Sequence, residues 1–178
     1  MSDIPGKPAG TAAVADDPHR VMVVDDSAVM RGLLSRALEG DPELRVVASV
    51  GDGQMAINAL TRQSIDVIVL DIEMPVMDGL TAIPKLVAID PAVKIIMAST
   101  LTLRGAEVSM KALQSGAADY VTKPSSTREL GAADSFKREL VGKVKALAAS
   151  ARRAGSRNRP SLRNERVAAP LAPLPRPR

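Results

Sequence analysis

Residues 21–27 read Val21-Met-Val-Val-Asp-Asp-Ser27, a run of four apolar residues that ends on two adjacent acids. A short apolar run with no polar residue at every second position is typical of a strand that is buried on both faces. Residues 66–71, Asp66-Val-Ile-Val-Leu-Asp71, have the same form and also end on an acid. Two such strands indicate a parallel sheet with helices on both sides.

Helical patterns alternate with these apolar runs along the chain. Residues 28–39 place their apolar side chains on one helical face, where Ser27 can cap the start and Gly40 can end the helix. Pro84, inside a later helical pattern, is expected to kink its helix. The predicted strands are 21–24, 45–50, 66–71, 93–98 and 119–122, and the predicted helices are 28–39, 54–62, 79–89, 104–114 and 132–149. This alternation predicts one α/β domain with a five-stranded parallel sheet.

The composition divides the chain into three regions. Residues 1–19 show no periodicity and are expected to form a flexible leader, residues 20–150 the folded domain, and residues 151–178 a disordered Arg/Pro-rich linker or tail. The first 150 residues hold 16 Lys and Arg against 19 Asp and Glu, whereas the tail holds eight Arg and one acid. The basic character of the chain therefore belongs to the tail.

The residue inventory excludes several classes of chemistry. The chain has no Cys, so it lacks thiol nucleophiles and Cys-ligated metals, and His19 is its single imidazole. Tyr120 and Phe136 are its two aromatic residues, too few for binding single-stranded nucleic acid by stacking. No apolar run reaches the roughly 20 residues of a membrane helix, and the N-terminus lacks the features of a signal peptide. These features predict a cytoplasmic protein that does not enter the membrane.

Polar side chains collect where the predicted strands end. In an open parallel sheet, functional sites lie at the edge formed by the carboxyl ends of the strands, here named the carboxyl edge. Each of these residues alone is most often a helix cap or a turn former, but their occurrence at successive strand ends favours a functional site. The residues are Asp25 and Asp26 after the first strand, Asp71 after the third, Ser99 and Thr100 after the fourth, and Lys123 after the fifth.

These residue types suit phosphoryl chemistry. Carboxylates held about 4 Å apart repel each other, and a hard divalent cation such as Mg²⁺ relieves that repulsion. Asp71 is the candidate nucleophile, because one of its oxygens can attack phosphorus in line while Lys123 offsets the charge of the phosphoryl group. Asp25 and Asp26 are candidate metal ligands, and Ser99 can donate a hydrogen bond to a phosphoryl oxygen.

Over residues 20–125 the chain resembles the receiver domain of bacterial two-component response regulators. The matching segments are 21–27, 69–79, 96–100 and 116–124. The resemblance implies a flavodoxin-like (βα)5 fold with the strand order 2-1-3-4-5. It also implies that Asp71 is phosphorylated from the phosphohistidine of a histidine kinase.

The resemblance assigns further roles to the site residues. It implies that Mg²⁺ is held by Asp26, by Asp71 and by the backbone carbonyl of Glu73, with Asp25 in the outer shell. It also implies a set of switching residues. These are Ser99 as the switch hydroxyl, Tyr120 as an aromatic that changes rotamer, Lys123 as the phosphate-binding lysine, and a cis Pro124 after it.

Switching is expected to link the site to a partner. Ser99 and Tyr120 are expected at the ends of adjacent strands, so that a movement of Ser99 toward the phosphoryl group leaves space for Tyr120 to turn inward. This movement would remodel the face made by the fourth helix, the fifth strand and the last helix, through which an output domain is contacted.

A narrower resemblance is to the regulatory half of chemotaxis protein-glutamate methylesterases. This resemblance rests on segments 25–34, 99–102 and 136–145 and on Glu73. No glycine-rich serine nucleophile motif follows residue 150, so the chain is not expected to be an esterase itself. It would instead be a truncated or split regulator whose Arg/Pro-rich end resembles an interdomain linker.

Two other functions remain open at this point. A stand-alone receiver could act as an interaction module or a phosphate sink. Nucleic-acid binding through the eight Arg of the tail ranks last, because no helix-turn-helix follows the domain and a solvated linker explains the same composition.

Overall fold

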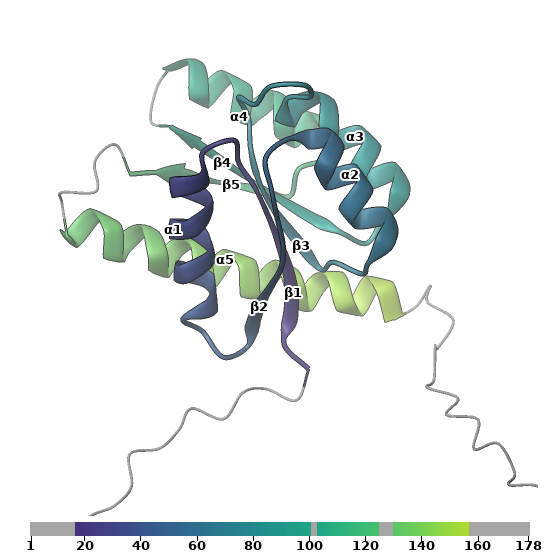
Figure 1. The fold of residues 1–178 in the computed structure, drawn as a ribbon, viewed down its shortest axis with the longest axis horizontal. Coiled ribbons are helices and arrows are strands. Elements are labelled where there is room, and N and C mark those ends of the chain that lie inside the picture. The colour runs from purple at the N-terminus through teal and green to yellow at the C-terminus, as the bar shows by residue number, and fades with distance from the viewer. Residues whose placement is uncertain (1–16, 101–102, 125–129, 157–178) are drawn as a thin grey trace, which may run out of the picture.

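The computed structural model describes residues 17–100, 103–124 and 130–156. Its five strands form one parallel sheet in the order β2-β1-β3-β4-β5, and a helix follows each strand in the chain (Figure 1). The strands are β1 (His19–Val24), β2 (Leu44–Val50), β3 (Val67–Asp71), β4 (Lys94–Thr100) and β5 (Asp119–Lys123). The helices are α1 (Ala28–Glu39), α2 (Gly53–Arg62), α3 (Gly79–Ile89), α4 (Leu103–Ser115) and α5 (Leu130–Ser156). The predicted flavodoxin-like fold and strand order are confirmed.

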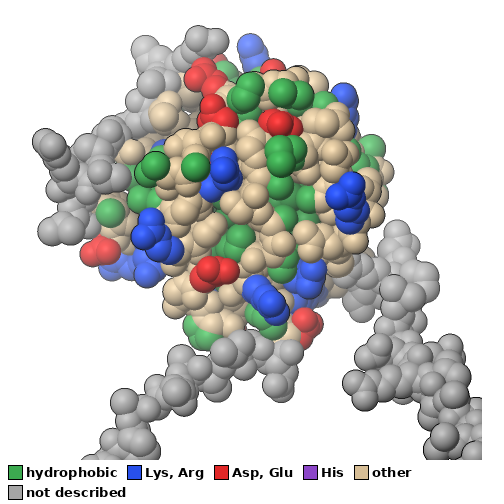
Figure 2. Space-filling model, in the orientation of Figure 1, with side chains coloured by type: hydrophobic (Ala, Val, Ile, Leu, Met, Phe, Trp, Pro, Cys, Tyr) green, Lys and Arg blue, Asp and Glu red, His purple; other side chains and the backbone are tan. Residues whose placement is uncertain are grey.

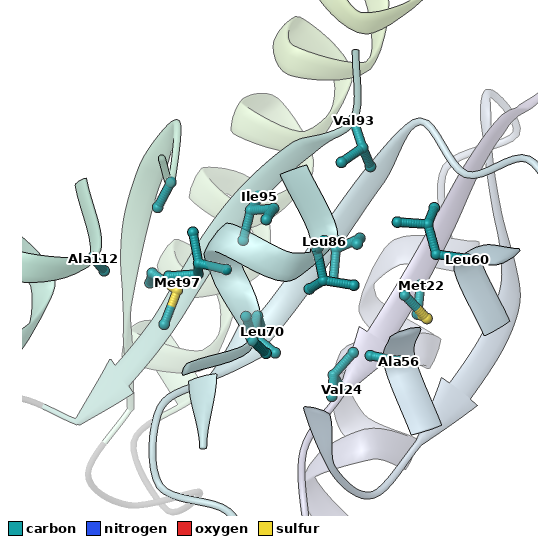
Figure 3. Packing of buried hydrophobic residues seen from close by; sticks show 14 of the residues in the cluster. Met22, Val24, Ala56, Leu60, Leu70, Leu86, Val93, Ile95, Met97 and Ala112 are labelled. Atoms are coloured by element: carbon teal, nitrogen blue, oxygen red, sulfur yellow. The ribbon is translucent and has the colours of Figure 1, made fainter. Parts of the chain in front are cut away.

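The helices cover the sheet on both faces. Helices α1 and α5 pack on one face, against alternate residues of the central strands such as Val23 and Val69. Helices α2, α3 and α4 cover the other face, where Leu86 packs in a cluster with Met22 and Leu70 (Figure 3). Successive strand residues point to opposite faces. The apolar runs are therefore continuous because both faces are buried.

Local signals position the helices that lead away from the carboxyl edge. Ser27 caps α1, Asp52 caps α2 and Asp78 caps α3, each by accepting a hydrogen bond from a backbone N–H in the first turn. Pro84 lies inside α3, which continues past it to Ile89. The expected kink at Pro84 stays a prediction.

The last helix is longer than its sequence pattern indicates. The predicted helix ends at residue 149, but α5 continues to Ser156, and Ala151 is buried. Residues 151–156 were assigned to the tail, and the structure corrects this assignment. The proposed disorder of the rest of the tail falls on residues 157–178, which lie outside the described residues, and most of the leader lies outside them too.

Arg152 is the physical reason for the longer helix. Its guanidinium contacts the Asp17 carboxylate at 2.9 Å and the Asp66 carboxylate at 3.2 Å, and it donates to the carbonyl of Pro18 at 2.7 Å. Asp66 is buried and also accepts the backbone N–H of Arg20. The end of α5 is thereby fixed to the segment that precedes β1.

One face of the molecule can be inspected for an extended basic patch. On the face drawn in Figure 2, Lys and Arg side chains are spread out rather than gathered in one patch. Within the described ranges, no helix has both the length and the apolar character that crossing a membrane requires.

Arg152→Ala is expected to lower the free energy of unfolding by about 1–3 kcal/mol, because it leaves the buried Asp66 carboxylate without its cation. Urea unfolding followed by circular dichroism measures this loss. Arg153→Ala is the matched control, since Arg153 is exposed on the same turn. Equal effects of the two variants would show that the contacts of Arg152 do not stabilise the fold.

Candidate functional site

The parallel register brings the predicted polar residues to one edge. Asp71 is the last residue of β3 and pairs with Ala98, and Lys123 is the last residue of β5 and pairs with Thr100. Asp25 follows directly on β1. Carboxylate oxygens of Asp25, Asp26 and Asp71 all lie within 4.8 Å of one another. The strand ends therefore place three acids beside one lysine.

Lys123 joins two of these acids. Its Nζ atom lies 2.6 Å from Oδ2 of Asp25 and 2.9 Å from Oδ1 of Asp71. Lys123 and Asp25 are buried, with 7% and 1% of their surface exposed, whereas Asp26 is exposed. A buried carboxylate without a partner is strongly destabilising, so the ammonium group is what allows two acids to stand together here.

Burial raises the pKa of the Asp71 carboxyl above its ordinary value of 3.8. Lys123 opposes this rise by stabilising the ionised form, and the negative charge of Asp25 reinforces it. Asp71 is thus an acid whose negative charge is poorly compensated by the groups around it. A cation placed among these carboxylates would supply the missing compensation.

A cleft opens beside Asp71. It has a volume of about 360 Å³. Its lining includes predicted site residues from four segments of the chain. These are Asp26, Asp71, Glu73, Ser99, Thr100 and Lys123.

Backbone contacts fix the loop between β3 and α3 against the site. The N–H of Gly79 donates to the carbonyl of Ile72 at 2.9 Å. A Cβ atom on Gly79 would stand 2.3 Å from the carbonyl oxygen of Asp71, closer than any real contact. The loop also contains Val76 at a φ of 67°, in the left-handed region. Only glycine at position 79 lets the loop approach the strand that carries Asp71.

Two positioning residues escaped the sequence analysis. Gly79 is one of them, and the Asp-Gly pair at 78–79, which is typical of a turn, is the sequence feature that could have identified it. Arg31 is the other, because its guanidinium donates to the carbonyls of Asp25 and Asp26 at 2.7 and 3.3 Å. Arg31 lies one turn into α1 with no distinguishing pattern, so sequence alone gave no reason to choose it.

Tyr120 lies within β5 and not at its end. It is the second residue of β5 and pairs with Met97, whereas Ser99 pairs with Thr122. The side chain of Tyr120 is 45% exposed and lies outside the lining of the cleft. The expectation that Ser99 and Tyr120 both end their strands is therefore wrong, because β5 continues for three residues after Tyr120.

Lys143 of α5 contacts both the ring and the backbone carbonyl of Tyr120. Its Nζ atom lies 5.1 Å from the centre of the Tyr120 ring and donates to the Tyr120 carbonyl at 2.6 Å. Lys143 also pairs with Asp119 at 3.2 Å and with Glu139 at 3.1 Å. Although partial burial opposes it, hydrogen bonding to these two acids raises the pKa of Lys143. The ring therefore faces a lysine that stays charged.

Pro124 also differs from the expectation. The resemblance implied a cis peptide bond before it, but the described residues contain no cis peptide bond. The trans form is the one that a bond before proline prefers, by about 0.5–1 kcal/mol.

Comparison with known proteins places this geometry in a family. The family model of the response regulator receiver domain matches residues 21–133. A protein-glutamate methylesterase/protein-glutamine glutaminase of Azospirillum brasilense is 73% identical over 173 residues, which are 96% of this chain and 42% of that protein. A second such protein, of a group 2 operon in Rhodospirillum centenum, is 66% identical over 88% of this chain and 40% of its own length. The chain thus spans about two fifths of the length of these curated relatives.

Solved structures agree with this placement. The response regulator domain of Thermotoga maritima CheB is 36% identical, with a TM-score of 0.66 over 74% of this chain and 97% of that one. The receiver domain of NarL from Mycobacterium tuberculosis is 27% identical, with a TM-score of 0.63 over 75% of this chain and 98% of that one. The two solved domains are each matched along nearly their whole length.

Gly79→Ala is expected to lower the free energy of unfolding by about 1–3 kcal/mol, because the new methyl group overlaps the Asp71 carbonyl and must displace the loop. Gly142→Ala is the opposite control: this exposed position on α5 has open space, and alanine there should stabilise the helix by about 0.5–1 kcal/mol. Denaturant unfolding measures both changes. A neutral Gly79→Ala variant would contradict the close approach.

Asp71→Asn is expected to raise the midpoint of thermal unfolding by about 2–4 °C at pH 7, because the neutral amide removes a charge that burial disfavours. A raised pKa means that the folded state binds the proton of Asp71 more tightly than the unfolded state does. The resulting stabilisation of the wild-type protein is complete below pH 3.8 and is lost as the pH rises through the raised pKa. The gain should therefore shrink as the pH falls from 7. A gain that does not change with pH would contradict this origin.

Proposed function

Because the chain belongs to the response regulator receiver domain family, we propose that it accepts a phosphoryl group on Asp71 from a histidine kinase and thereby controls a methylesterase output. One observation supports the choice of Asp71 above all others. Its carboxylate ends β3 on the wall of the cleft, 2.9 Å from the ammonium of Lys123 and close to the carboxylates of Asp25 and Asp26.

The transfer itself needs little from the protein beyond position and charge. An oxygen of the ionised Asp71 carboxylate attacks phosphorus while the bond from phosphorus to the histidine nitrogen of the kinase breaks, and an acyl phosphate results. The phosphoryl group adds roughly two negative charges beside Asp71. Lys123 already touches this carboxylate and offsets part of that charge.

The residues present also fit the divalent cation that the family implies. All the donors at the cleft are oxygens, which suits a hard ion such as Mg²⁺. We assign its binding to the carboxylates of Asp26 and Asp71 and to the backbone carbonyl of Glu73, which lines the same cleft. We assign Asp25 to the outer shell, because its two oxygens already accept hydrogen bonds from Lys123 and from the backbone N–H of Ser27. When bound, the ion supplies positive charge for the incoming phosphoryl group.

The signal then passes from Ser99 to Tyr120. Ser99 lies on the cleft, which supports a role for its hydroxyl as hydrogen-bond donor to a phosphoryl oxygen. In this structure Tyr120 is half-exposed and lies outside the cleft. An inward turn of its ring would change the surface that β5 shares with α4 and α5. We propose that the output domain contacts this surface.

The methylesterase assignment is supported by the relatives. Two curated proteins that match 88% or more of this chain at 66% identity or higher carry that name. Since the chain spans about two fifths of their length, the esterase activity is proposed for a partner domain and not for these residues.

Labelling with radioactive acetyl phosphate and Mg²⁺ tests the phosphoacceptor. The wild-type protein should incorporate label, and Asp71→Asn should incorporate none, because its amide cannot form the acyl phosphate. Asp78→Asn is the matched control, since Asp78 is an exposed acid on the same edge whose capping role asparagine can keep. Label in Asp71→Asn, or none in the folded wild-type protein, would refute the assignment.

A further inference from the structure

A second buried hydroxyl faces the switch serine. Ser109 lies on α4 and is 4% exposed, and Ser99 at the end of β4 is 6% exposed. Their two Oγ atoms are 3.4 Å apart. The sequence analysis gave Ser109 no role, because it is a small polar residue in the middle of a helical pattern.

The direction of this hydrogen bond follows from the number of available hydrogens. A serine hydroxyl carries one hydrogen and two lone pairs. The Oγ atom of Ser109 lies 2.8 Å from the carbonyl oxygen of Gly105, which can only accept, so the hydrogen of Ser109 is used there. Ser99 must therefore be the donor in the contact between the two serines. Its single hydrogen points toward α4 and not toward Asp71.

We propose that Ser109 is a positioning residue that holds the Ser99 hydroxyl in its unphosphorylated orientation and competes with the phosphoryl group for the hydrogen of Ser99. This inference rests on the proposed function, in which Ser99 donates to a phosphoryl oxygen. One hydrogen cannot serve both acceptors well. The bond to Ser109 must therefore break when the bond to the phosphoryl group forms.

The same contact ties α4 to β4. Helix α4 forms part of the wall of the cleft through Gly105 and Val108, which lie on the turn that precedes Ser109. Once Ser99 turns away, Ser109 keeps its bond within the helix, but the hydroxyl link between strand and helix is gone. Movement of one hydrogen thus removes one link between β4 and α4, the helix that borders the surface proposed to meet the output domain.

A purely helical role for Ser109 makes a different prediction. Ser115 on the same helix donates to the carbonyl of Lys111 at 2.9 Å, the same bond to the residue four positions earlier, but Ser115 is exposed. If only the bond within the helix matters, removal of either hydroxyl should have a similar effect.

Titration with beryllofluoride in the presence of Mg²⁺, followed by isothermal titration calorimetry, tests the proposal. Ser109→Ala should bind beryllofluoride about threefold tighter, and at most about tenfold, the equivalent of one ordinary hydrogen bond lost from the free state. Ser109→Cys, whose sulfur is a weak acceptor, should shift the affinity in the same direction. Ser109→Thr and Ser115→Ala should bind like the wild-type protein.

The effect must also depend on Ser99. In a Ser99→Ala background, Ser109→Ala should leave the affinity unchanged, because the hydrogen for which the two acceptors compete is absent. An unchanged or weaker affinity of Ser109→Ala, or the same gain in both backgrounds, would overturn the inference. The proposed function fails separately, if the wild-type protein does not bind beryllofluoride or if Asp71→Asn binds it equally well.

Discussion

The ammonium group of Lys123 is the constraint around which the carboxyl edge is organised. It lies between the carboxylates of Asp25 and Asp71, which come from the ends of β1 and β3, while Lys123 itself ends β5. The side chain must therefore pass the end of β4, where Ser99 lies. The strand order sets this meeting, because it brings the ends of β1, β3 and β5 to one edge, within reach of a single lysine side chain. Charge balance at the site is thus a property of the topology.

The charge balance of the site is incomplete, because one lysine contacts two of the three acids. Lys123 pairs with the buried Asp25 and with Asp71, whereas Asp26 is the exposed acid of the cluster. Such an acidic cluster is typical of the cation site of receiver domains. Lys123, Arg31 and the backbone around Gly79 position the walls of the cleft.

The sequence was sufficient for the features that local chemistry dictates. Continuous apolar runs such as 66–71 predicted buried parallel strands, and the acids and lysine at their ends predicted the site, because side chains at strand ends need no knowledge of distant packing. The sequence was insufficient where a distant partner decides. Arg152 extends α5 because it meets Asp17 and Asp66, residues far away along the chain. Ser109 and Arg31 are likewise defined only by what the fold places opposite them.

The contact between Arg152 and Asp17 also bears on how the domain can be connected to other proteins. It holds the start of β1 and the end of α5 together, although 135 positions separate the two residues. A domain whose two ends meet in this way can be inserted into a surface loop of a host protein without forcing that loop apart. The same adjacency permits circular permutation, in which a short peptide joins the ends and the chain is opened elsewhere. The fold is therefore suited to insertion as a compact unit in an engineered host.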